Sequence, residues 1–191
     1  MKILLSAVAT AVVAALAAPA GIAAAAPVAA SWQKHDFSFN YMGFTTHYSC
    51  DGLDEKLRLL LRRAGARPDV KIRSLCTAPM GGPQRITTAE LTFYTLRPAG
   101  AGAAVAAGKQ TGTSAVSGAW KTVKFRAGAP WEIGGGDCEL VEQFAHDILP
   151  MFTTRAVDNQ MTCVPHQVNA LGIDLQFEVL APLPQADRHP A

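Results

Sequence analysis

Two halves of this chain repeat one arrangement of tryptophan and cysteine residues. In each half a cysteine follows a tryptophan after eighteen residues, and a second cysteine follows the first after 26 or 25 residues. These residues are Trp32, Cys50 and Cys76 in the first half, and Trp120, Cys138 and Cys163 in the second. Each half then ends in the pattern L-x-F-x-x-L-x-P, at 91–98 and 175–182. So many matches in one order indicate an internal duplication.

Within the first half, apolar and polar residues alternate over 37–41, as they do in a half-buried strand. A helix is predicted from its cap at Ser49 to Gly65, because leucines recur at helical spacing behind an acidic first turn. Two more strands are predicted over 70–76 and 91–95. The second half repeats this order, and its elements are a strand around 123–125, a helix that Asp137 caps and Pro150 ends, a strand over 157–163 and a strand over 173–179.

These patterns predict an α+β fold of two β-α-β-β units, 31–98 and 120–182, with about six strands and two helices on one side. We expect the units to be related by a pseudo-twofold axis. The first two strands of each unit should run parallel, joined by a right-handed helical crossover. The sequence leaves open whether the strands form one continuous sheet or two small lobes.

The N-terminal residues have the features of a secretory signal peptide. Lys2 precedes an apolar stretch over 3–18, and small residues follow it. We expect residues 1–30 to be removed, with cleavage near Ala25 or after Ala30, which predicts a periplasmic or secreted protein. A membrane anchor is the alternative, but the apolar run is shorter than the ~20 residues that span a bilayer.

Two further segments are predicted to lie outside the folded units. Residues 99–119 consist mostly of Ala, Gly, Ser and Thr, a composition typical of flexible linkers. Residues 183–191 are rich in proline and polar residues and are predicted to be disordered.

Four cysteines in an exported chain indicate two disulfides, for which three pairings are possible. In each unit the helix runs away from the sheet end and the next strand brings the chain back, so both cysteines should lie at the same level. We therefore expect the pairs Cys50–Cys76 and Cys138–Cys163. A metal site is the weaker alternative, because the sequence has no C-x-x-C motif.

The segment from Gly43 to Leu53, which contains the letters YSCDGL, resembles a stretch of uncharacterised secreted proteins of proteobacteria. The likeness covers much of the chain after the leader. It implies export, and it assigns no activity, cofactor or site residue.

Charge limits the classes of partner. Removing Lys2 from the 17 Lys and Arg leaves 16, against 15 Asp and Glu, for a net charge of about +1. This balance argues against bulk electrostatic binding of nucleic acid. Basic residues of the first predicted helix, among them Arg58 and Arg62, form a surface that could meet phosphate or lipopolysaccharide, although a solvated helix face has the same composition.

His47 and Tyr48 directly precede the first helix and are candidate ligand contacts, together with Arg58 and Arg62. The histidines form no H-x-H or H-E-x-x-H motif, so neither a metal nor another cofactor is expected. We expect a non-enzymatic binding or structural protein of the cell envelope, whose partner is an envelope protein or a small ligand. The alternative is a periplasmic hydrolase or isomerase that uses His47 or His146 with a nearby carboxylate.

Overall fold

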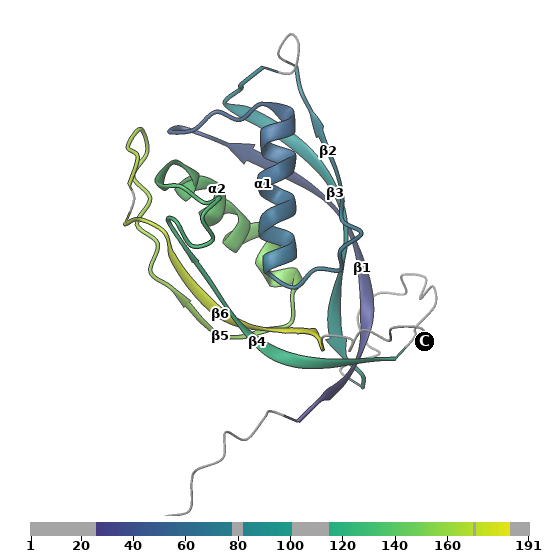
Figure 1. Ribbon diagram of the computed structural model, residues 1–191. Coiled ribbons are helices and arrows are strands. Elements are labelled where there is room, and N and C mark those ends of the chain that lie inside the picture. Colours follow the sequence, from purple (N-terminus) through teal and green to yellow (C-terminus); the bar gives the residue numbers. More distant parts are fainter. Residues whose placement is uncertain (1–25, 78–81, 101–114, 170, 184–191) are drawn as a thin grey trace, which may run out of the picture.

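The computed structural model of this chain describes residues 26–77, 82–100, 115–169 and 171–183 (Figure 1). Most of the predicted leader, linker and tail therefore lie outside the described residues. The elements are β1 (Val28–Met42), α1 (Cys50–Arg63), β2 (Lys71–Leu75), β3 (Ile86–Pro98), β4 (Val116–Arg126), the helical turn η2 (Gly135–Asp137), α2 (Cys138–Gln143), the helical turns η3 (Phe144–Ile148) and η4 (Leu149–Met151), β5 (Thr154–Asn159) and β6 (Asp174–Pro182).

The strands form one six-stranded sheet in the order β2-β3-β1-β4-β6-β5, and all neighbours are antiparallel. One continuous sheet is therefore present, not two lobes. β1 and β2 run in the same direction, as expected, but they are not hydrogen-bonded neighbours because β3 lies between them. β6 separates β4 from β5 in the same way. Figure 1 shows the sheet bent around α1 and α2, which lie on its concave face.

The strand register is equivalent in the two halves. Trp32 of β1 pairs with Leu96 of β3, and Trp120 of β4 pairs with Leu180 of β6. These four residues hold matched places in the sequence pattern, so the central pair of antiparallel strands has the same alignment in each half.

A short seam between β1 and β4 joins the halves. It consists of the pairs Val28↔Gly118, Ala29↔Ser117 and Ala30↔Val116. β1 thus begins three residues before the predicted first unit, and β4 begins four residues before the predicted second unit. Small residues allow the close approach, since a Cβ at Gly118 would lie 3.0 Å from Leu180 Cδ1. Because small residues are also typical of signal peptides and linkers, the sequence pattern assigned these strand ends to the leader and the linker.

The first helix follows its sequence pattern. The side chain of Ser49 caps α1 by accepting a hydrogen bond from the backbone N–H of Gly52, at 3.2 Å. Gly65 ends the helical segment with a φ of +96°, a conformation that favours glycine. The leucines at helical spacing form the buried face, namely Leu53, Leu57, Leu60 and Leu61.

The second helical segment is less regular than its pattern predicted. α2 has six residues, and the chain continues as the π-helical turn η3 and the 3-10 turn η4, which contains Pro150. Asp137 stands at the predicted capping position, but its side chain does not cap α2. Its carboxylate turns back to accept a hydrogen bond from the N–H of Gly134, at 2.7 Å. The predicted cap is therefore wrong, because other donors surround this carboxylate.

The edge strand β5 also differs from the prediction. It covers Thr154–Asn159, whereas the alternation had placed a strand over 157–163. The register with β6 shifts between Arg155 and Asp158, and Ala156 has a φ of +50°. This bulge leaves Val157 exposed. In the sequence, Val157 fitted an alternating pattern that continued to residue 163, and the strand was therefore predicted too far along the chain.

Both disulfides have the predicted pairing. The Cα atoms are 6.1 Å apart in Cys50–Cys76 and 5.5 Å apart in Cys138–Cys163, and no described cysteine is free. Each bridge joins the start of a helix to the segment that follows an edge strand. Closing a loop of this size contributes about 3.5 kcal/mol in the chain-entropy model.

A single main core spans both halves. It includes Phe39 of β1, Leu57 of α1, Phe125 of β4 and Phe144 of η3, all fully buried in one continuous cluster. The halves therefore stabilise each other through apolar burial. Among the described residues, no helix has the length and apolar character needed to cross a membrane.

Candidate functional site

The turn between β1 and α1, residues 43–49, packs against the start of α2. Gly43 donates its N–H to the carbonyl of Arg85 at 2.8 Å, and the Tyr41 hydroxyl donates to the carbonyl of Thr46 at 2.7 Å. Any side chain at Gly43 would collide with the Thr46 carbonyl oxygen. This tight turn directs the backbone N–H groups that follow Gly43 toward α2.

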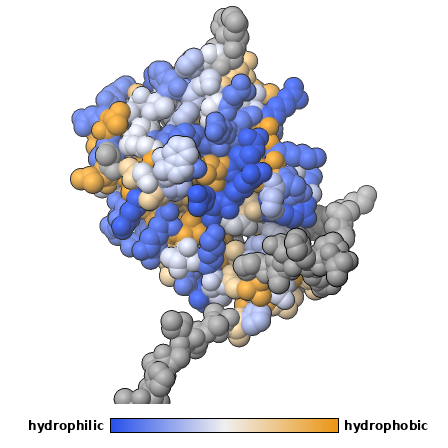
Figure 2. Space-filling view, in the orientation of Figure 1, coloured by the Kyte–Doolittle hydropathy of each residue, from blue (hydrophilic) through white to orange (hydrophobic). Residues whose placement is uncertain are grey.

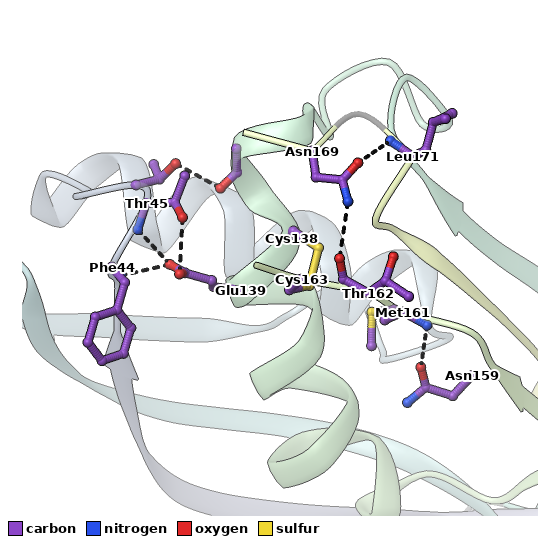
Figure 3. Close-up of a disulfide and its surroundings, with 12 residues drawn as sticks. Phe44, Thr45, Cys138, Glu139, Asn159, Met161, Thr162, Cys163, Asn169 and Leu171 are labelled. Atoms are coloured by element: carbon purple, nitrogen blue, oxygen red, sulfur yellow. Dashed lines mark hydrogen bonds between the residues drawn. A yellow bond between two sulfur atoms is a disulfide. The ribbon is translucent and has the colours of Figure 1, made fainter. Parts of the chain in front are cut away.

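Glu139 of α2 receives those groups (Figure 3). Its Oε2 accepts hydrogen bonds from the N–H of Phe44 at 2.8 Å and of Thr45 at 2.9 Å, and its Oε1 accepts one from the Thr45 hydroxyl at 3.1 Å. The side chain of Glu139 is buried. A buried carboxylate with three donors is stabilised in place, so Glu139 acts as a clamp between the halves.

Asp137 forms the second connection between the halves. Its Oδ1 accepts a hydrogen bond from the hydroxyl of Tyr48, and its Oδ2 lies 2.8 Å from Nζ of Lys56. Among the ion pairs of the described residues, Lys56–Asp137 alone links the two halves. Burial, and after it the charge of Asp137, raises the pKa of the Tyr48 hydroxyl far above its ordinary value, so Tyr48 remains a donor.

The structure separates the two candidate contacts that precede α1. Tyr48 is buried, and its hydroxyl is directed to Asp137 and not to solvent, so its place in the fold is structural. His47, the adjacent residue, is exposed. Sequence adjacency therefore does not bring these two side chains into one site.

His146 also lies in the open. Its side chain is 88% exposed, and Nδ1 lies 2.6 Å from Oδ1 of the neighbouring Asp147. A histidine–carboxylate pair on the protein surface holds no substrate against the imidazole. Among the described residues, no three His, Cys, Asp or Glu side chains are arranged to hold a metal ion. His47 and His146, the two histidines of the predicted hydrolase or isomerase, therefore both lie on the protein surface.

The basic surface of α1 is partly neutralised. Lys56 is paired with Asp137, and Arg67, which follows the end of α1, is paired with Asp69 at 2.6 Å. The guanidinium of Arg62 donates a hydrogen bond to a backbone carbonyl at 3.1 Å. No ion pair among the described residues neutralises Arg58 or Arg62, and the bond to a carbonyl leaves the charge of Arg62 in place, so both stay candidate contacts.

Exposed apolar side chains on two loops are a feature that sequence reasoning missed. Trp131, in the turn after β4, is 82% exposed, and Val168 and Leu171, in the loop between β5 and β6, are 73% and 90% exposed. Val164 of the same loop is also exposed. We call these four residues the loop end. Figure 2 shows hydrophobic atoms at the left margin of the molecule, where Figure 1 places the loop between β5 and β6.

The two loops leave the sheet side by side. β4 and β6 are antiparallel neighbours, and their pairing ends at Arg126↔Asp174, beyond which each loop begins or finishes. An ion pair between these two side chains, at 3.0 Å, reinforces the last rung. The disulfide Cys138–Cys163 ties the helix after the first loop to the second loop. The loop end is therefore presented from one end of the sheet.

Internal hydrogen bonds hold each loop in shape. In the first, Gly128 donates its N–H to the carbonyl of Ile133 at 2.6 Å, and Ile133 is buried. In the second, the side chain of Asn169 donates to the carbonyl of Thr162 at 3.1 Å and accepts from the N–H of Leu171 at 3.0 Å (Figure 3). These bonds hold the described residues on either side of each apolar tip and reduce the freedom that binding would have to remove.

No protein-family model, curated protein or solved structure matches this chain.

Proposed function

We propose that this protein is a non-enzymatic binding protein of the cell envelope and that it contacts its partner through the loop end. One contrast carries this proposal. The buried carboxylates Asp137 and Glu139 are used in bonds between the halves, whereas the large side chains of Trp131 and Leu171 are left in water on ordered loops. Exposing such side chains opposes solubility, which makes a partner that covers them the simplest reason to keep them.

Export is part of the proposal. The predicted leader and the two disulfides support it, because disulfides persist in oxidising compartments and are rare in the cytosol. The resemblance of the YSCDGL segment to secreted proteins of proteobacteria points in the same direction. We place the protein in the periplasm or outside the cell.

We also propose that the scaffold arose by duplication of one β-α-β-β unit. The strand order is the same in each half, read outward from the seam between β1 and β4. The pairing of the edge strands β2 and β5 also supports the duplication. Ile72 pairs with Leu91, and Asn159 pairs with Leu175. Ile72 and Asn159 each lie four residues before a disulfide cysteine, Cys76 and Cys163. The duplicated unit supplies the frame, and the loop end belongs to the second copy alone.

Site-specific photo-crosslinking tests the binding proposal. A photoreactive amino acid replaces Trp131 in cells that export the protein, and a second strain carries it at Val157, which is 52% exposed on β5. We expect a covalent adduct with an envelope component from position 131 and none from position 157. A third strain carries the photoreactive residue at Leu171, and absence of an adduct from both 131 and 171 would overturn the proposed function.

A further inference from the structure

The loop between β5 and β6 exposes apolar side chains and has no Asp, Glu, Lys or Arg, although polar residues such as His166 and Gln167 lie between them. Residues 160–172 contain no Asp, Glu, Lys or Arg, and the turn 127–136 contains only Glu132. Glu132 is half-buried, so it does not stand at the tip. Moving these tips out of water would therefore remove apolar surface without stripping the hydration of an exposed ion at either tip.

The chemistry of the tips matches that of a bilayer surface. Tryptophan favours the boundary between headgroups and acyl chains, and Leu and Val favour the hydrocarbon beneath it. Trp131 and Leu171 stand at the ends of two ordered loops that leave the same end of the sheet. Both loops adjoin the paired ends of β4 and β6, at Arg126 and Asp174.

A protein partner fits these observations less well. Stable protein interfaces combine an apolar centre with a polar rim and bury about 800 Å² on each side. Three residues of the loop end, Trp131, Val168 and Leu171, are 82%, 73% and 90% exposed, and the longer loop has no Asp, Glu, Lys or Arg to form ion pairs with a protein partner. Shallow insertion needs only the tips.

We infer that the loop end anchors this protein to a lipid bilayer by shallow insertion of Trp131, Val168 and Leu171. The inference rests on the proposed function and names the partner as the membrane surface. Because the tips carry no basic cluster, insertion is driven by apolar burial and not by attraction to anionic headgroups. Binding should therefore occur on neutral lipid and persist at high salt.

Vesicle co-sedimentation of the exported protein tests this inference. The probe is a vesicle of phosphatidylcholine alone, at 0.1 M and at 1 M NaCl. We expect similar binding at both salt concentrations. The variant Trp131→Ala/Leu171→Ser should reduce the partition coefficient by on the order of tenfold or more, because two inserted side chains are lost. The matched control is Val157→Ser, which removes an exposed apolar residue from β5 and should leave partitioning unchanged.

A spectroscopic arm identifies the inserting residue. In a Trp32→Phe/Trp120→Phe background Trp131 is the only tryptophan, and its emission should shift to shorter wavelength with vesicles and be quenched by brominated lipid. Binding that requires anionic lipid and disappears at 1 M NaCl would overturn the inference in favour of the basic α1 surface. No binding to neutral vesicles would also overturn it. If position 131 then still gave a protein adduct in cells, the proposed function would stand and only the lipid partner would be wrong.

Discussion

The hydroxyl of Tyr48 donates a hydrogen bond to Oδ1 of Asp137 and so connects the turn before α1 to the start of α2. These residues come from different halves, 89 positions apart in sequence. Tyr and Asp are residue types that often occur in active sites, but here Tyr48 and Asp137 hold the two halves together.

The first prediction concerns this bond. Tyr48→Phe should lower the free energy of unfolding by about 1–3 kcal/mol, because it removes a buried hydrogen-bond donor from the side chain of Asp137. Urea unfolding followed by circular dichroism measures the change. Thr88→Ala is the control, since its hydroxyl bonds Asn40 in an exposed pair, and it should cost no more than about 0.5 kcal/mol. Equal losses in the two variants would contradict the role assigned to Tyr48.

Glu139 gives a second prediction with a closely matched control. Glu139→Gln replaces an acceptor of two backbone N–H groups and one hydroxyl, and it should destabilise the protein by about 1.5–3 kcal/mol. Glu142→Gln makes the same change on the exposed side of α2 and should be nearly neutral. The thermal unfolding midpoints of the two variants test this prediction. An unchanged midpoint in Glu139→Gln would show that the Glu139 clamp contributes nothing to stability.

A third prediction concerns the disulfides. Non-reducing peptide mapping should recover Cys50–Cys76 and Cys138–Cys163 and no link between the halves. Replacing Cys138 and Cys163 by serine should cost about 3.5 kcal/mol, the entropy of closing a loop of this length. The same variant should also weaken vesicle binding, because that bridge fixes the loop between β5 and β6. A mapped Cys50–Cys138 peptide would refute the pairing.

A fourth prediction follows from His35, whose ring stacks on Phe93 and whose Nε2 lies 2.9 Å from Oγ1 of Thr95. Burial, with a contribution from Arg97, lowers the pKa of His35 from 6.5 to about 4. Between these values the unfolded chain binds the proton more tightly, so this contribution to stability is complete above pH 6.5 and is lost as pH falls toward 4. We expect about 1 kcal/mol less stability from this group at pH 5 than at pH 7, after allowance for partial exposure.

Urea unfolding at both pH values checks the His35 prediction. His35→Gln should show a smaller loss of stability between pH 7 and pH 5 than the unsubstituted protein. His47→Gln, which changes an exposed histidine, should leave the pH dependence as it is. If His35→Gln and the unsubstituted protein lost the same stability, the buried neutral state of His35 would be excluded.

Local sequence signals predicted the parts of the fold that local physics controls. α1 has its own cap at Ser49, its own apolar face and a glycine stop, and both ends were placed correctly. The disulfides followed from the direction of each helix and strand. β5 was misplaced because its bulge, which the sequence pattern does not mark, exposes Val157 and breaks the alternation.

The site was harder to predict because its contacts join distant segments. Glu139 resembled an ordinary acidic residue at a helix start, and only the approach of Phe44 and Thr45 reveals the clamp. Trp131 and Leu171 were missed for a related reason. An apolar residue in a loop is as readily buried as exposed, and sequence does not say which until the neighbouring strands are placed.

The central claim is that Asp137 and Glu139 hold the halves together, whereas the loop end binds the partner. One crosslinking comparison tests this division of roles most directly. A photoreactive amino acid is placed at Leu171, and the adduct yield in the envelope is measured for Trp131→Ala and for Glu139→Gln under conditions in which both remain folded. We predict that Trp131→Ala strongly reduces the adduct yield although its stability stays within about 0.5 kcal/mol of the parent. Glu139→Gln should keep the adduct although it is less stable. An adduct whose yield is unchanged by Trp131→Ala, or that folded Glu139→Gln loses, would contradict this division.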